Sequence, residues 1–127
     1  MIDEYLQNWL IKAEHDLKAA ENELKAAAED MLTDVICFHC QQAAEKFLKA
    51  CLIARKIEFG KTHNLKLLLE MCANQDKEFS GIDLGKLSFY AVQVRYPDDF
   101  YMPTPQEARE AFGVAVAIKR FVLGKLK

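Results

Sequence analysis

Two short polar segments contain residue types that bind phosphate groups in proteins. The first holds Lys61, Thr62 and His63, which together offer an ammonium group, a hydroxyl group and an imidazole ring. Donors of this kind bind an oxyanion well when they stand at a helix N-terminus, where backbone N–H groups also point at the anion. The alternative is structural, because Thr62 can cap a helix and His63 can hydrogen-bond within the core. The sequence leaves both interpretations open.

The second segment combines a guanidinium group with an aromatic ring and a rigid turn. It reads Arg95, Tyr96, Pro97 and Asp98. An arginine held beside a ring in this way can bind a phosphate through two hydrogen bonds or stack on a nucleic-acid base. The alternative is a salt bridge between Arg95 and Asp98 that stiffens the loop.

A polar stripe precedes both segments. Glu45 stands four residues before Lys49, which is the favourable order for an ion pair on a helix, and Gln42 and Lys46 fall on the same side. One interpretation is a solvated surface joined by salt bridges. The other is a polar wall that faces a cleft or a partner subunit.

Cys37, His39 and Cys40 are residue types that bind metal ions, but their spacing on a helix does not suit a metal cluster. On a helix the two cysteines turn into the apolar face while His39 turns to the polar side. No second Cys/His pair stands at the spacing typical of zinc sites. We therefore predict buried thiols, no metal and no cofactor. Four cysteines without a visible signal peptide also favour the reducing cytoplasm.

The composition limits the class of protein that positions these residues. The chain has 127 residues, of which 51% are hydrophobic and 28% are charged, and this predicts one globular domain over residues 1–127. A net charge of −2 argues against a protein that coats nucleic acid in general. No apolar run approaches the roughly 20 residues needed to cross a bilayer, so we expect no membrane segment.

Apolar residues recur in steps of three and four, which predicts an all-α fold without strands. Asp3 can cap the first helix, Thr33 or Asp34 the second, Thr62 the third and Thr104 the last. Pro97 should end the fourth helix near residues 95–96. The predicted helices span about 4–28, about 34–56, about 63–74, about 82–94 and about 105–123.

Taken in order, these motifs resemble the HEPN domain, a family of small α-helical proteins. The resemblance covers nearly the whole chain. It rests on Trp9, Ala13 and Asp16-Leu17, on residues 40–50, on Lys61-Thr62-His63-Asn64-Leu65 and on Arg95-Tyr96-Pro97-Asp98. It implies an up-and-down four-helix bundle with a short additional helix, usually a homodimer, in a prokaryotic organism.

The resemblance also implies two possible functions. Similar members are often encoded beside a minimal nucleotidyltransferase, as the toxin of a toxin–antitoxin pair or as a partner that helps to bind nucleotide. Many other HEPN proteins are metal-independent ribonucleases, whose signature is an Arg followed by a His after four to six residues. Here no His follows Arg95, Arg109 or Arg120, and seven residues separate Arg55 from His63, so the chain departs from that signature.

The leading hypothesis is therefore a non-catalytic homodimer that binds a nucleotide or phosphate-bearing ligand and acts with a separate nucleotidyltransferase. Lys61 and Arg95 would contact phosphate, while His63 and Tyr96 would orient the ligand or stack on its base. Thr62 and Asp98 complete the predicted ligand-binding set. The residues predicted to line the cleft or the subunit contact are Gln42, Glu45, Lys46 and Lys49.

Two alternatives remain open at this point. The first is a metal-independent ribonuclease with a displaced active site, in which His63 is the base and Arg95 binds the phosphate. The second is a dimerising bundle whose polar residues only satisfy the core and the interface.

Overall fold

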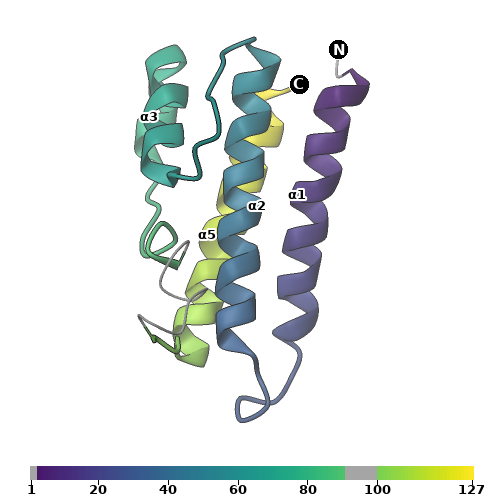
Figure 1. Cartoon of the computed structure of the whole chain (residues 1–127), viewed down its shortest axis with the longest axis vertical. Coiled ribbons are helices and arrows are strands. Elements are labelled where there is room, and N and C mark those ends of the chain that lie inside the picture. Colours follow the sequence, from purple (N-terminus) through teal and green to yellow (C-terminus); the bar gives the residue numbers. More distant parts are fainter. Residues whose placement is uncertain (1–2, 91–99) are drawn as a thin grey trace.

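The computed structural model describes residues 3–90 and 100–127, which form an all-helical bundle (Figure 1). The helices are α1 (Glu4–Glu23), α2 (Thr33–Ala54), α3 (Leu65–Gln75) and α5 (Pro105–Lys125), with a 3₁₀ helix, η1, over Lys77–Gly81. Neither of these two ranges contains a strand. The predicted class of a helical bundle is confirmed.

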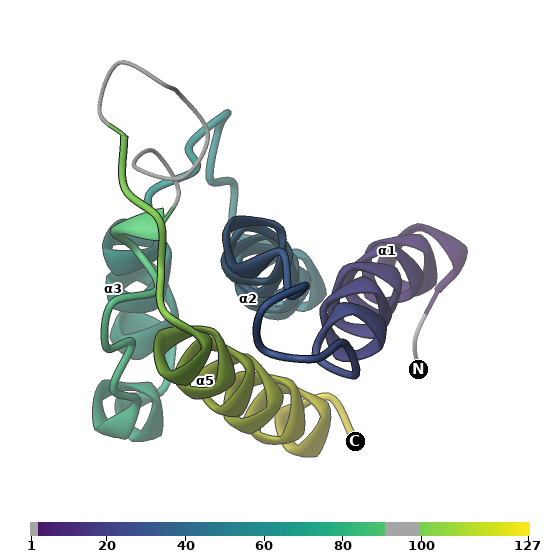
Figure 2. The same ribbon diagram turned by 90° about the horizontal axis from the view of Figure 1, so that it is seen from below.

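Helix α2 is the central element of the bundle. Seen from below, α1 and α3 lie on opposite sides of α2, and α5 packs against it from a third side (Figure 2). Helix α1 runs antiparallel to α2, whereas α5 runs parallel to it (Figure 1). The connection from α2 to α3 turns back along α2, which brings His63 beside Glu45. Almost every face of α2 is therefore covered.

The core follows the periodicity of the sequence. The buried residues of α1 recur in steps of three and four: Leu6, Leu10, Ala13, Leu17 and Ala20. The two alanines are fully covered, so the helices can approach closely. Burying one large apolar side chain of the core, such as a leucine, stabilises the fold by about 1.5–3 kcal/mol. The largest fully buried side chains of α2 are Ile36, Phe47, Leu48, Leu52 and Gln41.

All four cysteines are buried and free, which confirms the prediction of core thiols. Burial raises the pKa of the Cys37 and Cys72 thiols to about 12 and that of Cys51 to about 11, and it raises the pKa of Cys40 as well. Because the thiolate is the reactive form, these groups are chemically inert in the folded protein.

Helix α1 ends at Glu23, several residues before the predicted end near Ala28. The N–H groups of Lys25 and Ala26 bond to carbonyls only three residues back, which tightens the chain into a turn. Ala27 and Ala28 are exposed, so their burial cannot hold another helical turn. The Glu23 carboxylate then accepts a hydrogen bond from the Leu32 N–H at 3.1 Å and closes the connection to α2.

The start of α2 also differs from the prediction. Leu32 is the N-cap residue and supplies no side-chain hydrogen bond. Thr33 is not the cap, because its hydroxyl donates to the Pro103 carbonyl at 2.6 Å and ties α2 to the start of α5. Asp34 lies inside the first turn, where its carboxylate accepts from the Val35 N–H. A tertiary contact thus takes the hydroxyl that the local pattern assigned to capping.

Helix α3 begins at Leu65 and not at His63. Asn64 caps it by accepting from the Leu67 N–H at 3.1 Å, whereas the Thr62 hydroxyl accepts from the Asn64 N–H. Asparagine is at least as good an N-cap as threonine. Lys61, Thr62 and His63 therefore lie in the connection before α3, so the prediction that they form the helix start is wrong.

The region predicted as a helix from Ile82 to Val94 starts differently. Residues 82–84 have no regular secondary structure and residues 85–89 form turns, while η1 occupies a segment that the sequence predicted to be a loop. Gly85 has a φ angle of 55°, in the left-handed region that a right-handed helix does not use. Residues 91–99 lie outside the described residues, and the predicted end near residues 95–96 lies among them.

Helix α5 starts as the sequence predicts, with Thr104 and Glu107 in a reciprocal capping box. The Glu107 carboxylate also accepts from the Tyr101 hydroxyl at 2.6 Å and from the Lys86 ammonium group at 2.9 Å. The bond from Tyr101, followed by those from the Thr104 N–H and Lys86, lowers the pKa of Glu107 to about 2. One carboxylate thereby joins three segments of the chain.

We predict that Glu107→Gln lowers the free energy of unfolding by about 1–2 kcal/mol at pH 7, since it weakens a cap and charged hydrogen bonds. The pKa in the folded state lies below the value of about 4.3 in an unfolded chain, so this stabilisation is present above about pH 5. It is lost as the pH falls through the folded value of about 2. Urea unfolding of the wild type and the variant at pH 7 and at pH 2 measures the loss of stability and its dependence on pH, with Glu110→Gln as the control. An equal loss at both pH values would contradict the assignment.

Candidate functional site

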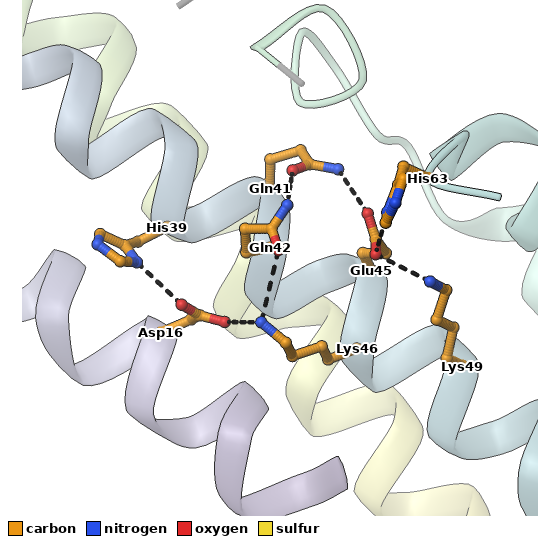
Figure 3. A network of polar contacts seen from close by, with 8 residues as sticks. All are labelled: Asp16, His39, Gln41, Gln42, Glu45, Lys46, Lys49 and His63. Carbon is orange, nitrogen blue, oxygen red and sulfur yellow. Dashed lines mark hydrogen bonds and ion pairs between the residues drawn. The ribbon is translucent and has the colours of Figure 1, made fainter. Parts of the chain in front are cut away.

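A continuous series of hydrogen bonds and ion pairs crosses α2 and links α1 to the connection before α3 (Figure 3). It begins at the imidazole of one histidine and ends at the imidazole of another. Its members are Asp16, His39, Gln41, Gln42, Glu45, Lys46, Lys49 and His63.

The centre of this network is a buried ion pair within α2. Glu45 is 3% exposed and Lys49 is 5% exposed, and their charged atoms lie 3.0 Å apart. The interpretation of this pair as a solvated surface is therefore wrong. A buried charge needs a partner and further hydrogen bonds. His63 Nδ1, at 2.9 Å from the Glu45 carboxylate, and Gln41 Nε2, at 3.2 Å, supply them.

The two adjacent glutamines connect the network in one direction. The Lys46 ammonium group can only donate, and it approaches the Gln42 side-chain oxygen at 3.5 Å. Gln42 Nε2 then donates to the Gln41 oxygen at 2.8 Å, and Gln41 Nε2 donates to Glu45. A carboxylate can only accept, so both amides are oriented by the charged groups at the two ends. The Gln41-Gln42 pair thus positions Glu45 from the side of α1.

Opposing effects set the protonation state of Glu45. Burial by itself would raise the pKa of this carboxyl group, but the hydrogen bonds from His63, Lys49 and Gln41 outweigh burial and lower it below the usual value. Glu45 is therefore a carboxylate, and His63 donates to it through Nδ1–H. The other ring nitrogen of His63 is then turned away from Glu45, on a side chain that is 68% exposed. The arrangement can orient an imidazole for binding or for proton transfer.

A second histidine and carboxylate pair stands at the other end of the network. Asp16 of α1 lies 2.9 Å from His39 Nδ1 of α2 and also accepts from Lys46. The sequence placed His39 and Lys46 on the polar side of α2 but gave no sign that Asp16 pairs with them. Only the packing of α1 on α2 brings these groups together, since Asp16 and His39 are 23 positions apart in the sequence.

A groove of about 820 Å³ lies beside the buried end of the network. Its wall includes two predicted ligand residues, Lys61 and His63, together with Lys49. The sequence missed its other wall residues. They are Tyr5, Trp9, Ile53, Lys56, Ile57, Glu58, Phe59 and Gly60.

Two aromatic rings define the inner part of the groove. Trp9 and Phe59 meet edge to face, with ring centroids 6.0 Å apart and planes at 90°. The Lys49 ammonium group lies 5.7 Å from the Trp9 centroid and 5.2 Å from the Phe59 centroid, which are distances of cation–π contacts. Lys49 thus links the aromatic wall to Glu45. The sequence signals for Trp9 were its place in the apolar pattern of the first helix and its match to the HEPN pattern, and neither indicated a groove.

The other predicted site residues fall in three places. Gln42 and Lys46 are half-buried in the network, outside the groove wall. The hydroxyl of Thr62 is engaged in the turn before α3. Arg95, Tyr96 and Asp98 lie outside the described residues.

The side chain of Arg55 contacts the end of α3. Its guanidinium group donates to the Gln75 carbonyl at 3.2 Å and lies 3.5 Å from the Asp76 carboxylate. It therefore interacts favourably with the C-terminal end of α3, where the carbonyl groups carry partial negative charge. Among the described residues, no group of three or more His, Cys, Asp or Glu side chains is placed to hold a metal ion.

Comparison with known proteins assigns the family. The HEPN domain profile matches residues 6–126, so the chain belongs to the HEPN domain family. It is similar to the crystal structure of ST0689, an archaeal HEPN homologue, with 27% identity, a TM-score of 0.67 and coverage of 96% of this chain and 98% of that one. It is also similar to TT1696 from Thermus thermophilus, with 29% identity, a TM-score of 0.70 and coverage of 95% and 98%. No curated protein sequence matches it.

The helices of the described residues include none with the length and apolar character required to span a bilayer.

We predict that Glu45→Gln is strongly destabilising, because it leaves the Lys49 ammonium group buried without its counter-charge. Loss of one partner of a buried pair costs about 3–5 kcal/mol. Asp16→Asn is the matched control, since it makes the same change at the more exposed end of the network and should cost clearly less. Urea unfolding at pH 7 compares the two variants. An equal, small loss for both would show that Glu45 does not hold the network.

Proposed function

We propose that this HEPN protein binds a nucleotide or another phosphate-bearing ligand and acts as a homodimer with a separate minimal nucleotidyltransferase, without itself catalysing a reaction. The observation that carries the proposal is the groove beside the Glu45 network. Three lysines and an imidazole line it, although the whole chain has a net charge of −2. A local excess of positive charge on an acidic protein supports an anionic ligand.

The charges of the groove differ in how far they are already neutralised. Lys49 is paired with Glu45 and buried. Lys56 and Lys61 are exposed and have no ion-pair partner within residues 3–90 and 100–127. Among the described residues, Glu58 is the one carboxylate on the groove wall. The two unpaired ammonium groups are therefore the ones available to a phosphate group.

The partners in the proposal rest on family membership. Membership of the HEPN family supports a homodimer, a nucleotidyltransferase partner and a toxin–antitoxin pair as expectations. The half-buried polar residues Gln42 and Lys46 remain the proposed contact with a cleft or a second subunit. Arg95, from the sequence motif, remains the proposed second phosphate contact, with Tyr96 beside it.

We predict that Lys61→Ala and Arg95→Ala each weaken binding of nucleoside 5′-monophosphates about ten-fold or more, because each removes a charged hydrogen bond to phosphate. Isothermal titration calorimetry measures the dissociation constants, and circular dichroism checks that the helices are intact. Lys12→Ala is the control, since Lys12 is an exposed lysine of α1 outside the groove. If both variants bind as the wild type does, the phosphate assignment is wrong.

One observation favours ribonuclease activity as the second candidate function. His63 is held at Nδ1 by a carboxylate and is largely exposed, which is how many proteins orient a general base. The substrate would supply its own nucleophile, the ribose 2′-hydroxyl group. Against this stands the missing Arg and His signature of HEPN ribonucleases.

An RNA cleavage assay in EDTA separates the two functions. We predict that His63→Ala and Arg95→Ala leave any RNA cleavage by the preparation at the level of the wild type. Equal residual cleavage in all three proteins would be contamination. Cleavage by the wild type that is lost in both variants would instead establish a metal-independent ribonuclease and overturn the non-catalytic assignment.

A further inference from the structure

Lys56 has an unusual backbone conformation where it lines the groove. Its φ angle is 59°, and within the described residues it is the one non-glycine residue with a positive φ. It follows the C-cap of α2, where its N–H donates to the Ile53 carbonyl at 3.0 Å and the Ile57 N–H donates to the Leu52 carbonyl at 2.9 Å. These two bonds define a Schellman motif, and its left-handed position is usually glycine.

The side chain of Lys56 makes no ion pair within residues 3–90 and 100–127 that would offset the strain of this backbone conformation. Lys56 is exposed and forms no ion pair with the described part of the chain. A left-handed conformation is strained for any residue with a Cβ atom, and glycine would relieve that strain. Strained residues of this kind concentrate at ligand sites. The ammonium group of Lys56 is exposed at the groove wall and is free to meet an anion there.

The aromatic part of the groove offers a complementary surface. The perpendicular rings of Trp9 and Phe59 form a corner in the same groove as Lys56. Both residues are only half-buried, so each keeps exposed surface besides its contact with Lys49. A third flat ring fits such a corner by stacking on one ring and meeting the other edge-on. Nucleic-acid bases stack on aromatic side chains in this way whatever their identity. A volume of about 820 Å³ also lies within the usual range for small-molecule sites.

We propose that one chain holds a single nucleoside phosphate in this groove, with the base in the Trp9 and Phe59 corner and the phosphate on Lys56. The inference rests on the proposed function and deepens it, because it places base and phosphate recognition within one subunit and adds Lys56 to the ligand contacts. Neither Tyr96 nor a second copy of the chain is needed for the base.

Trp9 provides the readout, because it is the sole tryptophan of the chain. Its fluorescence is followed while the wild-type protein is titrated with the four nucleoside 5′-monophosphates, the matching nucleosides and ribose 5-phosphate. We expect at least one monophosphate to bind about ten-fold more tightly than both its nucleoside and ribose 5-phosphate, since each fragment lacks one half of the contacts.

The outcomes separate this inference from the function on which it rests. If ribose 5-phosphate binds as tightly as every monophosphate, the aromatic corner takes no base and the inference fails, while phosphate binding stands. If calorimetry detects no binding of any phosphate compound, both fail. Phe59→Leu, which keeps an apolar side chain without a ring, should abolish the preference for the monophosphate over ribose 5-phosphate. An unchanged preference would overturn the assignment of the corner.

Lys56→Gly tests the phosphate contact. We expect the variant to be more stable, with Tm raised by about 3 °C, yet to bind the best monophosphate about ten-fold more weakly. Lys56→Arg should retain binding, and Lys56→Asn, which tolerates the left-handed conformation without a charge, should lose it. Lys66→Met is the control for the loss of an exposed lysine, because Lys66 lies on α3 and methionine keeps the helix intact. A glycine variant that is less stable, or that binds as tightly as the wild type, would overturn the proposal.

Discussion

The buried ion pair between Glu45 and Lys49 is the interaction on which the rest of the arrangement depends. Helix α2 is covered by α1, α3, α5 and its own following connection, so it has no polar face that is open to water over its full length. Two charges in that position are stable only if other groups complete their hydrogen bonds. Gln41 and His63 do so for the carboxylate, and the rings of Trp9 and Phe59 lie at cation–π distance from the ammonium group.

This requirement couples the fold to the groove. His63 can reach Glu45 because the connection after α2 turns back along that helix, and the Schellman motif at Lys56 starts that turn. The same return path places Phe59 against Trp9 of α1. The walls of the groove are thus the segments that satisfy the buried pair. Because the core holds these walls in place, the ligand binding proposed above would need little reorganisation of the groove.

Within the HEPN family, the chain combines a shared scaffold with a site that its own residues define. The profile match and the similar crystal structures cover nearly the whole chain, whereas the Arg and His spacing of HEPN ribonucleases is missing from the sequence. Its polar residues instead form two imidazole–carboxylate pairs, at His63 and at His39, joined through two glutamines. In the proposal, such a chain uses oriented polar groups to recognise a ligand and leaves the chemistry to a partner enzyme.

The sequence by itself determined the helical class, the buried stripes and the capping box at Thr104, because these depend on contacts between residues three or four apart. It also indicated Lys61 and His63 as polar groups of interest. Only the tertiary structure decided that Glu45 is buried, that Asp16 pairs with His39, 23 positions away, and that Thr33 bonds to Pro103, 70 positions away. Helical periodicity sets which face a residue occupies. The packing of one helix on another sets what that face meets, and no local pattern encodes it.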